Sequence, residues 1–292
     1  MNSRLTALKA DRIVGVSYPI CVTCGVQYGG SVSSCPVCED PRQYVPVSGQ
    51  AWTSLEALRV DHRNRFDSDH GVLGVGTTPK FGIGQRALLV EDVLWDCITL
   101  LDEETIERIG SLRAIAISHP HYYSSMVEWA HAFDCPVLIH EADREWVMRP
   151  DARVEYWSGE TYDLGAGMTL IRCGGHFAGG TVLHLGADFS EVDPASRPDQ
   201  PPHLERPPGG DLFAGDIVQV IPDRQWVAFM YSFPNYIPLP AAAVRAVGAA
   251  LEPFAFERIY GAWWEAVIEA DGSGIVRRSV ERYVAALDGY LP

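Results

Sequence analysis

Four of the seven cysteines stand in two close pairs near the N-terminus. Cys21 and Cys24 form one C-x2-C pair, Cys35 and Cys38 form a second, and ten residues separate the pairs. Each such pair makes a tight turn whose two sulfurs point at one ion. The odd cysteine count and the doubled spacing suit metal ligation in a reducing compartment better than a disulfide framework. We therefore predict a four-cysteine metal knuckle over residues 16–46.

The residues around the two cysteine pairs indicate which class of metal knuckle they form. The segments CVTCGVQY and CPVCEDPRQY resemble the rubredoxin-like knuckles attached to rubrerythrins, and structural zinc ribbons share most of these features. A tetrathiolate site accepts zinc or iron, so the metal stays open, with zinc favoured over iron. A nucleic-acid-reading ribbon is disfavoured because residues 16–46 carry a single cation, Arg42.

A second group of residues suited to metal binding lies further along the chain. The apolar run AIAI leads into Ser-His-Pro-His, so a strand would end by presenting His119 and His121 on the same side. His176 follows in the glycine-rich segment CGGHFAGG, and Asp216 follows the apolar run of LFAGDIV. Asp96 closes a further strand-like run, VLWD. Imidazoles and a carboxylate are ligands of zinc, iron(II) and manganese(II).

In this order and spacing the residues resemble the metallo-β-lactamase superfamily, over roughly residues 71–270. The resemblance implies an α/β protein, an αββα sandwich with the small knuckle appended. It implies that His119, His121 and His176 bind one divalent metal together with Asp216. It also implies that Asp96 supports the histidine-bearing loop through hydrogen bonds rather than binding the metal.

The residues that bind the second metal in that superfamily are replaced by others in this sequence. Tyr123 stands where the family has an aspartate, and Ser124 stands where it has a histidine. Residues 261–263, Gly-Ala-Trp, occupy the place of a late Gly-His. We therefore predict one mononuclear site, binding zinc, iron or manganese, in which Asp216 is catalytic and Tyr123 donates to a developing oxyanion.

Aromatic and polar residues near these positions are candidates for the substrate pocket. The predicted pocket residues are Tyr122, Trp263, Trp264, Tyr231 and Asn235. Their uncharged character favours a flat or apolar small molecule. Two alternatives stay open: the tyrosine pair covers the lost site as core residues, and the tryptophan pair serves packing.

Hydrophobic periodicity predicts an α/β alternation followed by a meander of short strands. The expected helices are 103–109, 124–133, 143–147, 240–251 and 274–287. The expected strands are 87–90, 93–97, 114–117, 136–140, 159–164, 168–172, 181–185, 212–213, 217–221, 226–230 and 258–260. The turn-rich residues 1–70 are interpreted as an N-terminal segment and residues 71–292 as the main domain. Residues 191–211, rich in Pro, Asp and Gly, are either a lid or a disordered insertion.

The composition of the chain disfavours some classes of binding partner. A net charge of -15 and a pI near 4.9, with no basic run, disfavour nucleic acid and anionic membranes. The apolar stretches are shorter than a membrane span, and the N-terminal residues MNSRLTALKADR lack the apolar centre of a signal peptide. We expect a cytoplasmic protein with a small-molecule substrate, and a homodimer stays open.

Three functions are consistent with these features. The first is a metal-dependent hydrolase of a small, largely apolar ester, thioester, lactone or amide. The second is an iron-dependent oxidoreductase or dioxygenase with a rubredoxin-like iron centre, since the same superfamily contains redox enzymes. The third is a binding protein that keeps its metal for structure alone.

Overall fold

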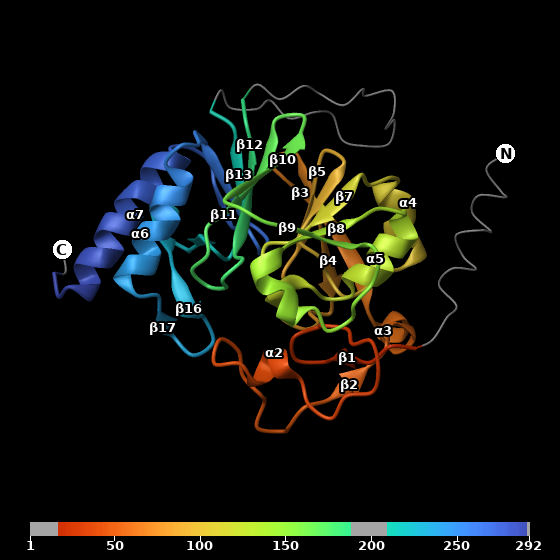
Figure 1. The fold of residues 1–292 in the computed structure, drawn as a ribbon. Coiled ribbons are helices and arrows are strands. Elements are labelled where there is room, and N and C mark those ends of the chain that lie inside the picture. The colour runs from red at the N-terminus through yellow and green to blue at the C-terminus, as the bar shows by residue number, and fades with distance from the viewer. Residues whose placement is uncertain (1–16, 188–208, 291–292) are drawn as a thin grey trace.

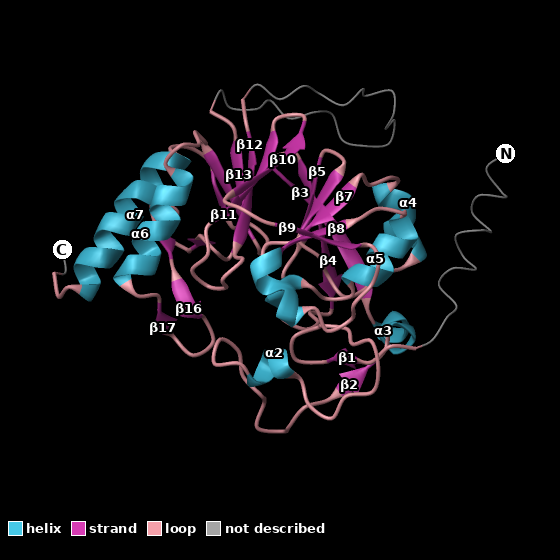
Figure 2. Cartoon of the chain, in the orientation of Figure 1, coloured by secondary structure: helices cyan, strands magenta, loops and turns pink. Residues whose placement is uncertain are grey.

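Two β-sheets pack face to face, and α-helices cover the outer face of each sheet (Figures 1 and 2). The computed structural model describes residues 17–187 and 209–290, and all structural statements concern these residues. The predicted αββα sandwich with an N-terminal four-cysteine knuckle is confirmed. None of the described helices is long and apolar enough to cross a membrane.

The first sheet has seven strands, and their order in the sheet follows the order in the chain. Neighbouring strands are antiparallel from β3 to β6 and parallel from β6 to β9. The strands are β3 (Arg63–Asp69), β4 (Val72–Thr78), β5 (Ala87–Val90), β6 (Val93–Trp95), β7 (Ala114–Ala116), β8 (Val137–His140) and β9 (Val154–Trp157). The three parallel pairs require crossovers, which contain α4 (Glu103–Ile109), α5 (Met126–Phe133) and, between β8 and β9, the 3-10 helix η2 (Glu141–Trp146).

The second sheet has six strands in the order β10-β11-β12-β13-β18-β19. All neighbours are antiparallel except β13 and β18. The strands are β10 (Thr161–Gly165), β11 (Met168–Arg172), β12 (Thr181–Leu185), β13 (Asp211–Gly215), β18 (Arg258–Gly261) and β19 (Val267–Ile268). The helices α6 (Ala241–Leu251) and α7 (Gly272–Leu287) pack on the outer face of this sheet.

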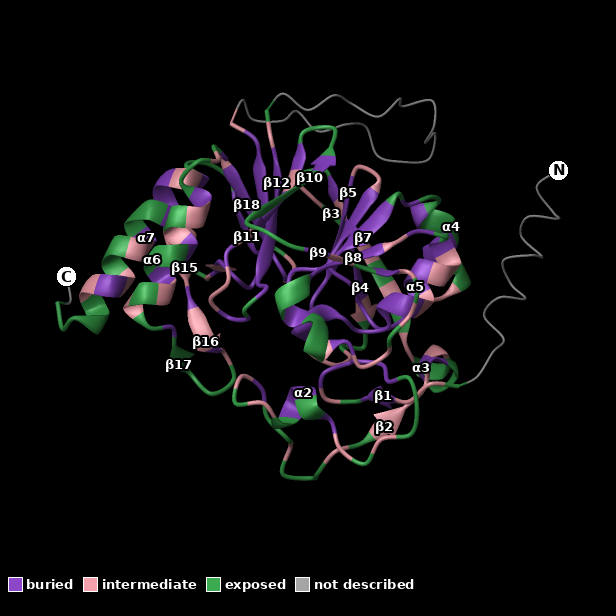
Figure 3. Ribbon diagram, viewed as in Figure 1, coloured by how far each residue is buried: buried purple, intermediate pink, exposed green. Residues whose placement is uncertain are grey.

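Three apolar clusters hold these layers together (Figure 3). The middle cluster joins the inner faces of the two sheets, with Trp95 and Leu138 from one and Phe213 and Tyr260 from the other. The outer clusters join the first sheet to α4 and α5, and the second sheet to α6 and α7. Each fully buried aliphatic or aromatic side chain contributes roughly 1.5–3 kcal/mol. The fold is therefore determined by apolar faces that the sequence periodicity already marks.

Short elements complete the structure near the site. The loops carry two 3-10 helices, η1 (Pro120–Tyr122) and η2 (Glu141–Trp146). Two small antiparallel pairs precede α6: β14 (Gln219–Val220) with β15 (Val227–Ala228), and β16 (Met230–Ser232) with β17 (Ile237–Pro238).

The N-terminal segment forms a compact unit docked against the sandwich. It contains β1 (Ile20–Cys21), α2 (Pro36–Glu39), β2 (Trp52–Thr53) and α3 (Leu55–Asp61), and β1 pairs with β2. The Thr99 hydroxyl donates to the Gly25 carbonyl at 2.9 Å, and the Gln27 amide donates to the Ser124 carbonyl at 3.0 Å. The knuckle is thus tied to the loops that follow β6 and η1.

The boundary expected at residue 71 lies too late in the chain. All seven residues of β3 (Arg63–Asp69) pair with β4, so the first sheet begins at Arg63. The sequence RNRFDSD contains one apolar side chain because β3 is an edge strand with exposed or half-buried residues. β9 was likewise not expected. The segment 191–211 falls mostly outside the described residues, which resume at 209.

Candidate metal centres

Three histidines from two loops meet at one end of the sandwich. His119 follows β7, His121 lies in η1, and His176 lies in the loop after β11. One ligand nitrogen from each lies within 4.8 Å of the others. The loop holding His176 closes through the Gly174 amide and the Gly180 carbonyl, 2.9 Å apart. A Cβ on Gly180 would lie 2.6 Å from the Gly174 carbonyl oxygen, so this turn requires glycine.

The distances in the cluster fit a shared metal ion. His176 Nε2 lies 3.0 Å from His121 Nδ1, and Asp216, which follows β13, places Oδ1 3.2 Å from His119 Nε2. Ligands with bonds of about 2.0–2.1 Å to a tetrahedral zinc ion lie about 3.4 Å apart. The three imidazoles lie close enough to one another to bind the same ion. Asp216 adjoins this cluster because its Oδ1 lies next to His119 Nε2.

Hydrogen bonds orient the imidazole of His119. The Ser118 hydroxyl donates to Asp96 Oδ1 at 2.7 Å, and the Ser118 amide donates to the same oxygen at 2.8 Å. Because its single proton is used in this way, the hydroxyl accepts from His119 Nδ1, 2.9 Å away. This assignment leaves the lone pair of His119 Nε2 facing the cluster. Asp96 therefore acts on the histidine through Ser118.

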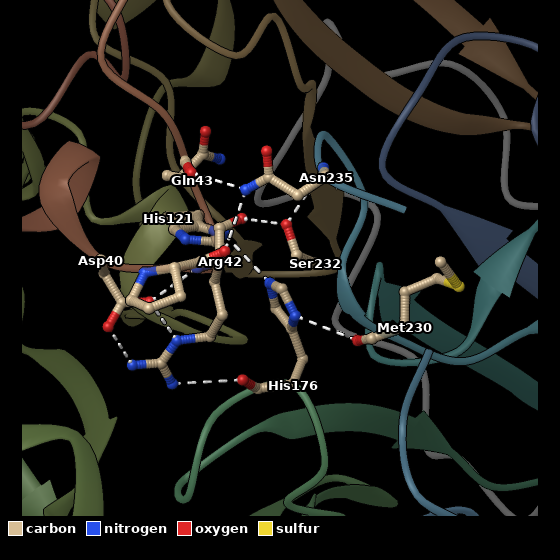
Figure 4. Close-up of polar contacts among 9 residues, drawn as sticks. Asp40, Arg42, Gln43, His121, His176, Met230, Ser232 and Asn235 are labelled. Carbon is tan, nitrogen blue, oxygen red and sulfur yellow. Dashed lines mark hydrogen bonds and ion pairs between the residues drawn. The ribbon is translucent and has the colours of Figure 1, made fainter. Parts of the chain in front are cut away.

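The imidazole of His176 is oriented by a different element. Its Nδ1 lies 3.2 Å from the carbonyl of Met230, at the start of β16. A carbonyl can only accept, so Nδ1 carries the proton and Nε2 presents a lone pair to the cluster. Figure 4 shows this contact together with the approach of His121 to the opposite side of the ring.

Burial sets the protonation of the cluster. His119, His121 and His176 are 1%, 2% and 2% exposed, and burial lowers the pKa of each, that of His176 to about 4. Burial, with the nearby charge of Asp96, raises the pKa of Asp216 to about 7. Neutral imidazoles are the form that binds metal. A carboxylate in so buried a position needs a cation beside it.

Unpaired polar atoms support the same conclusion. Across the described residues, His119 Nε2 and Asp216 Oδ1 are buried without a hydrogen-bond partner, although they lie at ion-pair distance from each other. Buried polar atoms are normally paired, and an ion is one reason for an exception. The residues present therefore fit a divalent metal.

Tyr122, the last residue of η1, and Tyr123, which follows it, lie in different surroundings. The Tyr122 ring packs on His119 with 4.3 Å between centroids, and burial and the charge of Asp216 raise the pKa of Tyr122. Burial and the charge of Asp143 raise the pKa of Tyr123. Successive side chains of a 3-10 turn are about 120° apart. The structure thus brings Tyr122, and not Tyr123, to the Asp216 carboxylate.

The predicted pocket residues separate into two groups. Trp264 packs on the backbone of Gly74 and Gly76 and beneath Arg65 and Arg86, so it serves packing. Trp263, half-buried, joins the clusters on both sheets. Its neighbours are the buried side chains of these two clusters.

The other pocket candidates lie closer to the histidines. Tyr231 lies beside Arg42 of the knuckle, with the guanidinium 5.7 Å from the ring. Asn235 donates through Nδ2 to the carbonyls of Pro41 and Gln43 at 3.0 and 2.9 Å. Its amide is therefore engaged by the knuckle, because the turn between β16 and β17 reaches the segment after Cys38.

Ser124, which stands where the superfamily has a histidine, is held by hydrogen bonds to neighbouring polar groups. Ser124, at φ +48°, accepts from Gln85 Nε2 at 3.1 Å, and its hydroxyl lies 3.3 Å from the Cys97 carbonyl. The Gln85 amide also donates to Cys97 at 2.8 Å. These bonds hold the buried Ser124 side chain against the loop after β6.

The four knuckle cysteines form the second centre. Cys21 Sγ lies 3.6 Å from Cys38 Sγ, and Cys24 Sγ lies 3.6 Å from Cys35 Sγ. Metal–sulfur bonds of about 2.3 Å place tetrahedral sulfurs about 3.8 Å apart. The neighbouring thiols lower the pKa of Cys21, and burial raises that of Cys24. The four thiols fit one tetrathiolate ion.

Further residues contact the two metal centres without binding the metal themselves. Phe177 packs against all three imidazoles, with centroid distances of 5.6, 4.8 and 5.1 Å to His119, His121 and His176. Tyr28 donates to Cys35 Sγ at 2.9 Å. Phe177 follows a ligand directly and could have been marked by that neighbourhood. The roles of Met230 and Arg42 had no signal in the sequence.

No protein-family model matches the chain. A protein of Bacillus subtilis (strain 168), named "Uncharacterized protein YmaE", is 45% identical over 289 residues, covering 94% of this chain and 98% of that protein.

Solved structures with the metallo-β-lactamase fold are more distantly similar. A B3 metallo-β-lactamase with an active-site glutamic acid is 14% identical, with a TM-score of 0.46, covering 87% of this chain and 97% of that chain. The metallo-β-lactamase SMB-1 is 17% identical, with a TM-score of 0.45, covering 76% and 93%. TTHA1623 in a di-iron-bound form is 20% identical, with a TM-score of 0.44, covering 70% and 97%.

Proposed function

The chain belongs to the family of the Bacillus subtilis protein YmaE, and we propose that it is a metal-dependent hydrolase with a mononuclear site. One observation carries the proposal. His119, His121 and His176 converge on one point beside the buried Asp216, whose Oδ1 has no hydrogen-bond partner. Such a site binds a divalent ion through neutral nitrogens and retains a carboxylate able to hold a proton.

The chain's own residues support hydrolytic chemistry. A bound divalent ion would polarise a carbonyl oxygen and make a water ligand more acidic. The Asp216 carboxylate, 3.2 Å from His119 Nε2, would orient that water and accept its proton. Tyr122, which packs on His119 and lies near Asp216, closes one side of this carboxylate.

The surroundings favour a small and largely apolar substrate. Phe177 lies against the three imidazoles, and Phe233 lies 5.8 Å from the His176 ring. Tyr231 and Trp146 flank the guanidinium of Arg42 at the same place. Aromatic walls favour an apolar acyl group. We propose an ester, thioester, lactone or amide of this kind.

The oxidoreductase remains a second candidate because the two metal centres are neighbours. The Arg42 guanidinium, four residues after Cys38, donates to the carbonyl of the ligand His176 at 3.2 Å. Iron in the tetracysteine site would then be linked to the histidine site through the segment from Cys38 to Arg42 and this hydrogen bond. The metal content separates this candidate from the hydrolase and from a metal-stabilised binding protein.

A His176→Ala variant tests the hydrolase. We expect two zinc ions per wild-type chain, one per H176A chain, and turnover of activated aryl esters only in the former. His184→Ala is the matched control, because His184 is another buried histidine that bonds a backbone carbonyl, that of Ala255 at 2.8 Å. It should retain both ions and the activity.

Two results would overturn the proposal. A wild-type protein that binds both zinc ions but turns over none of these acyl substrates would favour the binding protein. A reddish protein with iron in the tetrathiolate site, without esterase activity, would favour redox chemistry.

A further inference from the structure

A short segment of the knuckle lies directly over the histidine site. We call residues 40–43 (Asp-Pro-Arg-Gln) the strap. Its start is fixed by the second cysteine pair, because α2 spans Pro36–Glu39, includes Cys38, and ends where the Asp40 amide donates to the Pro36 carbonyl at 3.0 Å. A metal that holds Cys35 and Cys38 therefore also fixes the beginning of the strap.

Within the strap, the Arg42 side chain binds the loop that carries His176. Asp40 holds the guanidinium with both oxygens, at 2.6 Å to Nε and 2.8 Å to Nη2. Nη1 donates to the His176 carbonyl at 3.2 Å, and the guanidinium lies 3.7 Å from the Phe177 ring centroid. The Arg42 and Asp40 side chains are 13% and 12% exposed. A bidentate, partly buried ion pair of this kind fixes both side chains more firmly than a surface ion pair does.

The far side of the strap is held by the same β16–β17 turn that orients His176. The Ser232 hydroxyl donates to the Arg42 carbonyl at 3.0 Å, and Asn235 binds the Pro41 and Gln43 carbonyls. Met230, at the other end of β16, accepts from His176 Nδ1. In Figure 4 the strap, the turn and His176 form one connected set of hydrogen bonds.

We propose that Arg42 is a positioning residue that couples the two metal centres, so that metal in the tetracysteine site strengthens metal binding at the histidine site. The route runs from Cys38 through Asp40 and Arg42 to His176. Four buried thiols without an ion loosen a small knuckle, because metal binding supplies much of the stability of such folds. The strap then loses its fixed start and the His176 loop loses one of its supports.

The coupling has a reciprocal consequence. If the tetracysteine metal raises the affinity of the histidine site by some factor, the histidine-site metal must raise that of the tetracysteine site by the same factor. The proposal rests on the two metal sites and not on the hydrolase chemistry, so it stands or fails independently of the proposed function.

The test compares zinc release from Arg42→Gln and from wild type into a chromogenic chelator. The phase of release from the histidine site is identified as the one that H176A lacks. Loss of a residue supporting a metal ligand typically weakens binding by 10–100-fold, so we expect release from this site to be on the order of 10-fold faster in R42Q. Release from the tetracysteine site should change less, because we expect this four-thiolate site to empty second, when the histidine site has lost its zinc and the coupling no longer acts.

Arg144→Gln is the matched control. Arg144 also stacks on a ring, that of Tyr156 at 3.6 Å, and also pairs with a carboxylate, Glu141, without bonding to the strap. It should release zinc as wild type does. Equal release rates in R42Q and wild type would overturn the proposal, and so would equal acceleration of both phases, which would indicate general loosening.

A second arm tests the coupling itself. Removing the tetracysteine metal with a thiol-directed mercurial should accelerate zinc release from the histidine site of wild type. In R42Q the same treatment should give little further acceleration, because the connection is already broken. Equal acceleration in both proteins would overturn the role of Arg42.

Discussion

Ser118→Ala tests whether the hydrogen bonds behind His119 set its affinity for metal. The change removes one buried oxygen, and with it the 2.7 Å bond to Asp96 Oδ1 and the 2.9 Å contact with His119 Nδ1. Asp96 keeps the Ser118 amide at 2.8 Å, but the Nδ1 proton of His119 loses its partner. The ring is then free to rotate and to exchange tautomers.

The expected size follows from these two contacts. A buried group left unsatisfied costs about 1–3 kcal/mol, and loss of a group that orients a ligand lowers metal affinity by about 10–100-fold. The latter corresponds to about 1.4–2.7 kcal/mol of binding free energy. We therefore expect zinc at the histidine site of S118A to be 10–100-fold weaker, with the tetracysteine site unchanged.

The assay is a competitive titration with a chelator of known zinc affinity. Ser125→Ala is the control, because Ser125 is also buried in this loop and its hydroxyl donates to the Thr99 carbonyl at 2.6 Å without contacting a histidine. S125A should lose about 1 kcal/mol of folding stability and keep its zinc affinity. Equal zinc affinity in S118A and wild type would refute the reasoning, and so would equal weakening in S118A and S125A.

Two further predictions concern stability. Asp143 is buried, accepts from the Gly179 amide at 2.8 Å, and has a pKa raised by burial from 3.8 to about 6. The folded state binds this proton more tightly than the unfolded state, so its contribution is present below pH 4 and is lost as pH rises through 6. D143N should be more stable than wild type by up to about 3 kcal/mol at pH 7 but not at pH 4 in urea unfolding, and a difference independent of pH would contradict this. Gly25→Ala should unfold at lower urea concentration than Gly49→Ala: both glycines have φ near +84°, but only at Gly25 would a Cβ lie 2.4 Å from Thr99 Oγ1, whereas Gly49 has open space. Equal midpoints would show that the knuckle is not tightly docked there.

The strength of the apolar pattern decided how much of the fold could be predicted. The helix at Glu103–Ile109 and the strands at Ala87–Val90, Met168–Arg172 and Thr181–Leu185 have the predicted bounds, because each has a clear buried face. β3 was missed because an edge strand can be almost wholly polar. Its pairing with β4 depends on the hairpin and not on its own pattern.

The candidate site also combines residues that the sequence reveals with residues that it does not reveal. His119, His121 and the cysteine pairs are separated by a few residues, so local spacing revealed them. The contact between Arg42 and His176 spans 134 positions and that between His176 and Met230 spans 54. The choice between Tyr122 and Tyr123 depends on the phase of a 3-10 turn, which residue types do not determine. Contacts of this kind come from packing.

His176 shows why the motif alone is insufficient evidence for a working metal site. Its loop is held by Asp143 at the Gly179 amide, by the Met230 carbonyl at Nδ1 and by Arg42 at the backbone carbonyl. These supports come from η2, β16 and the knuckle. A related chain could keep the glycine-rich loop and its histidine, lose any of these supports, and bind metal weakly. The ligands define which ion can bind, whereas the supports determine how tightly it is held.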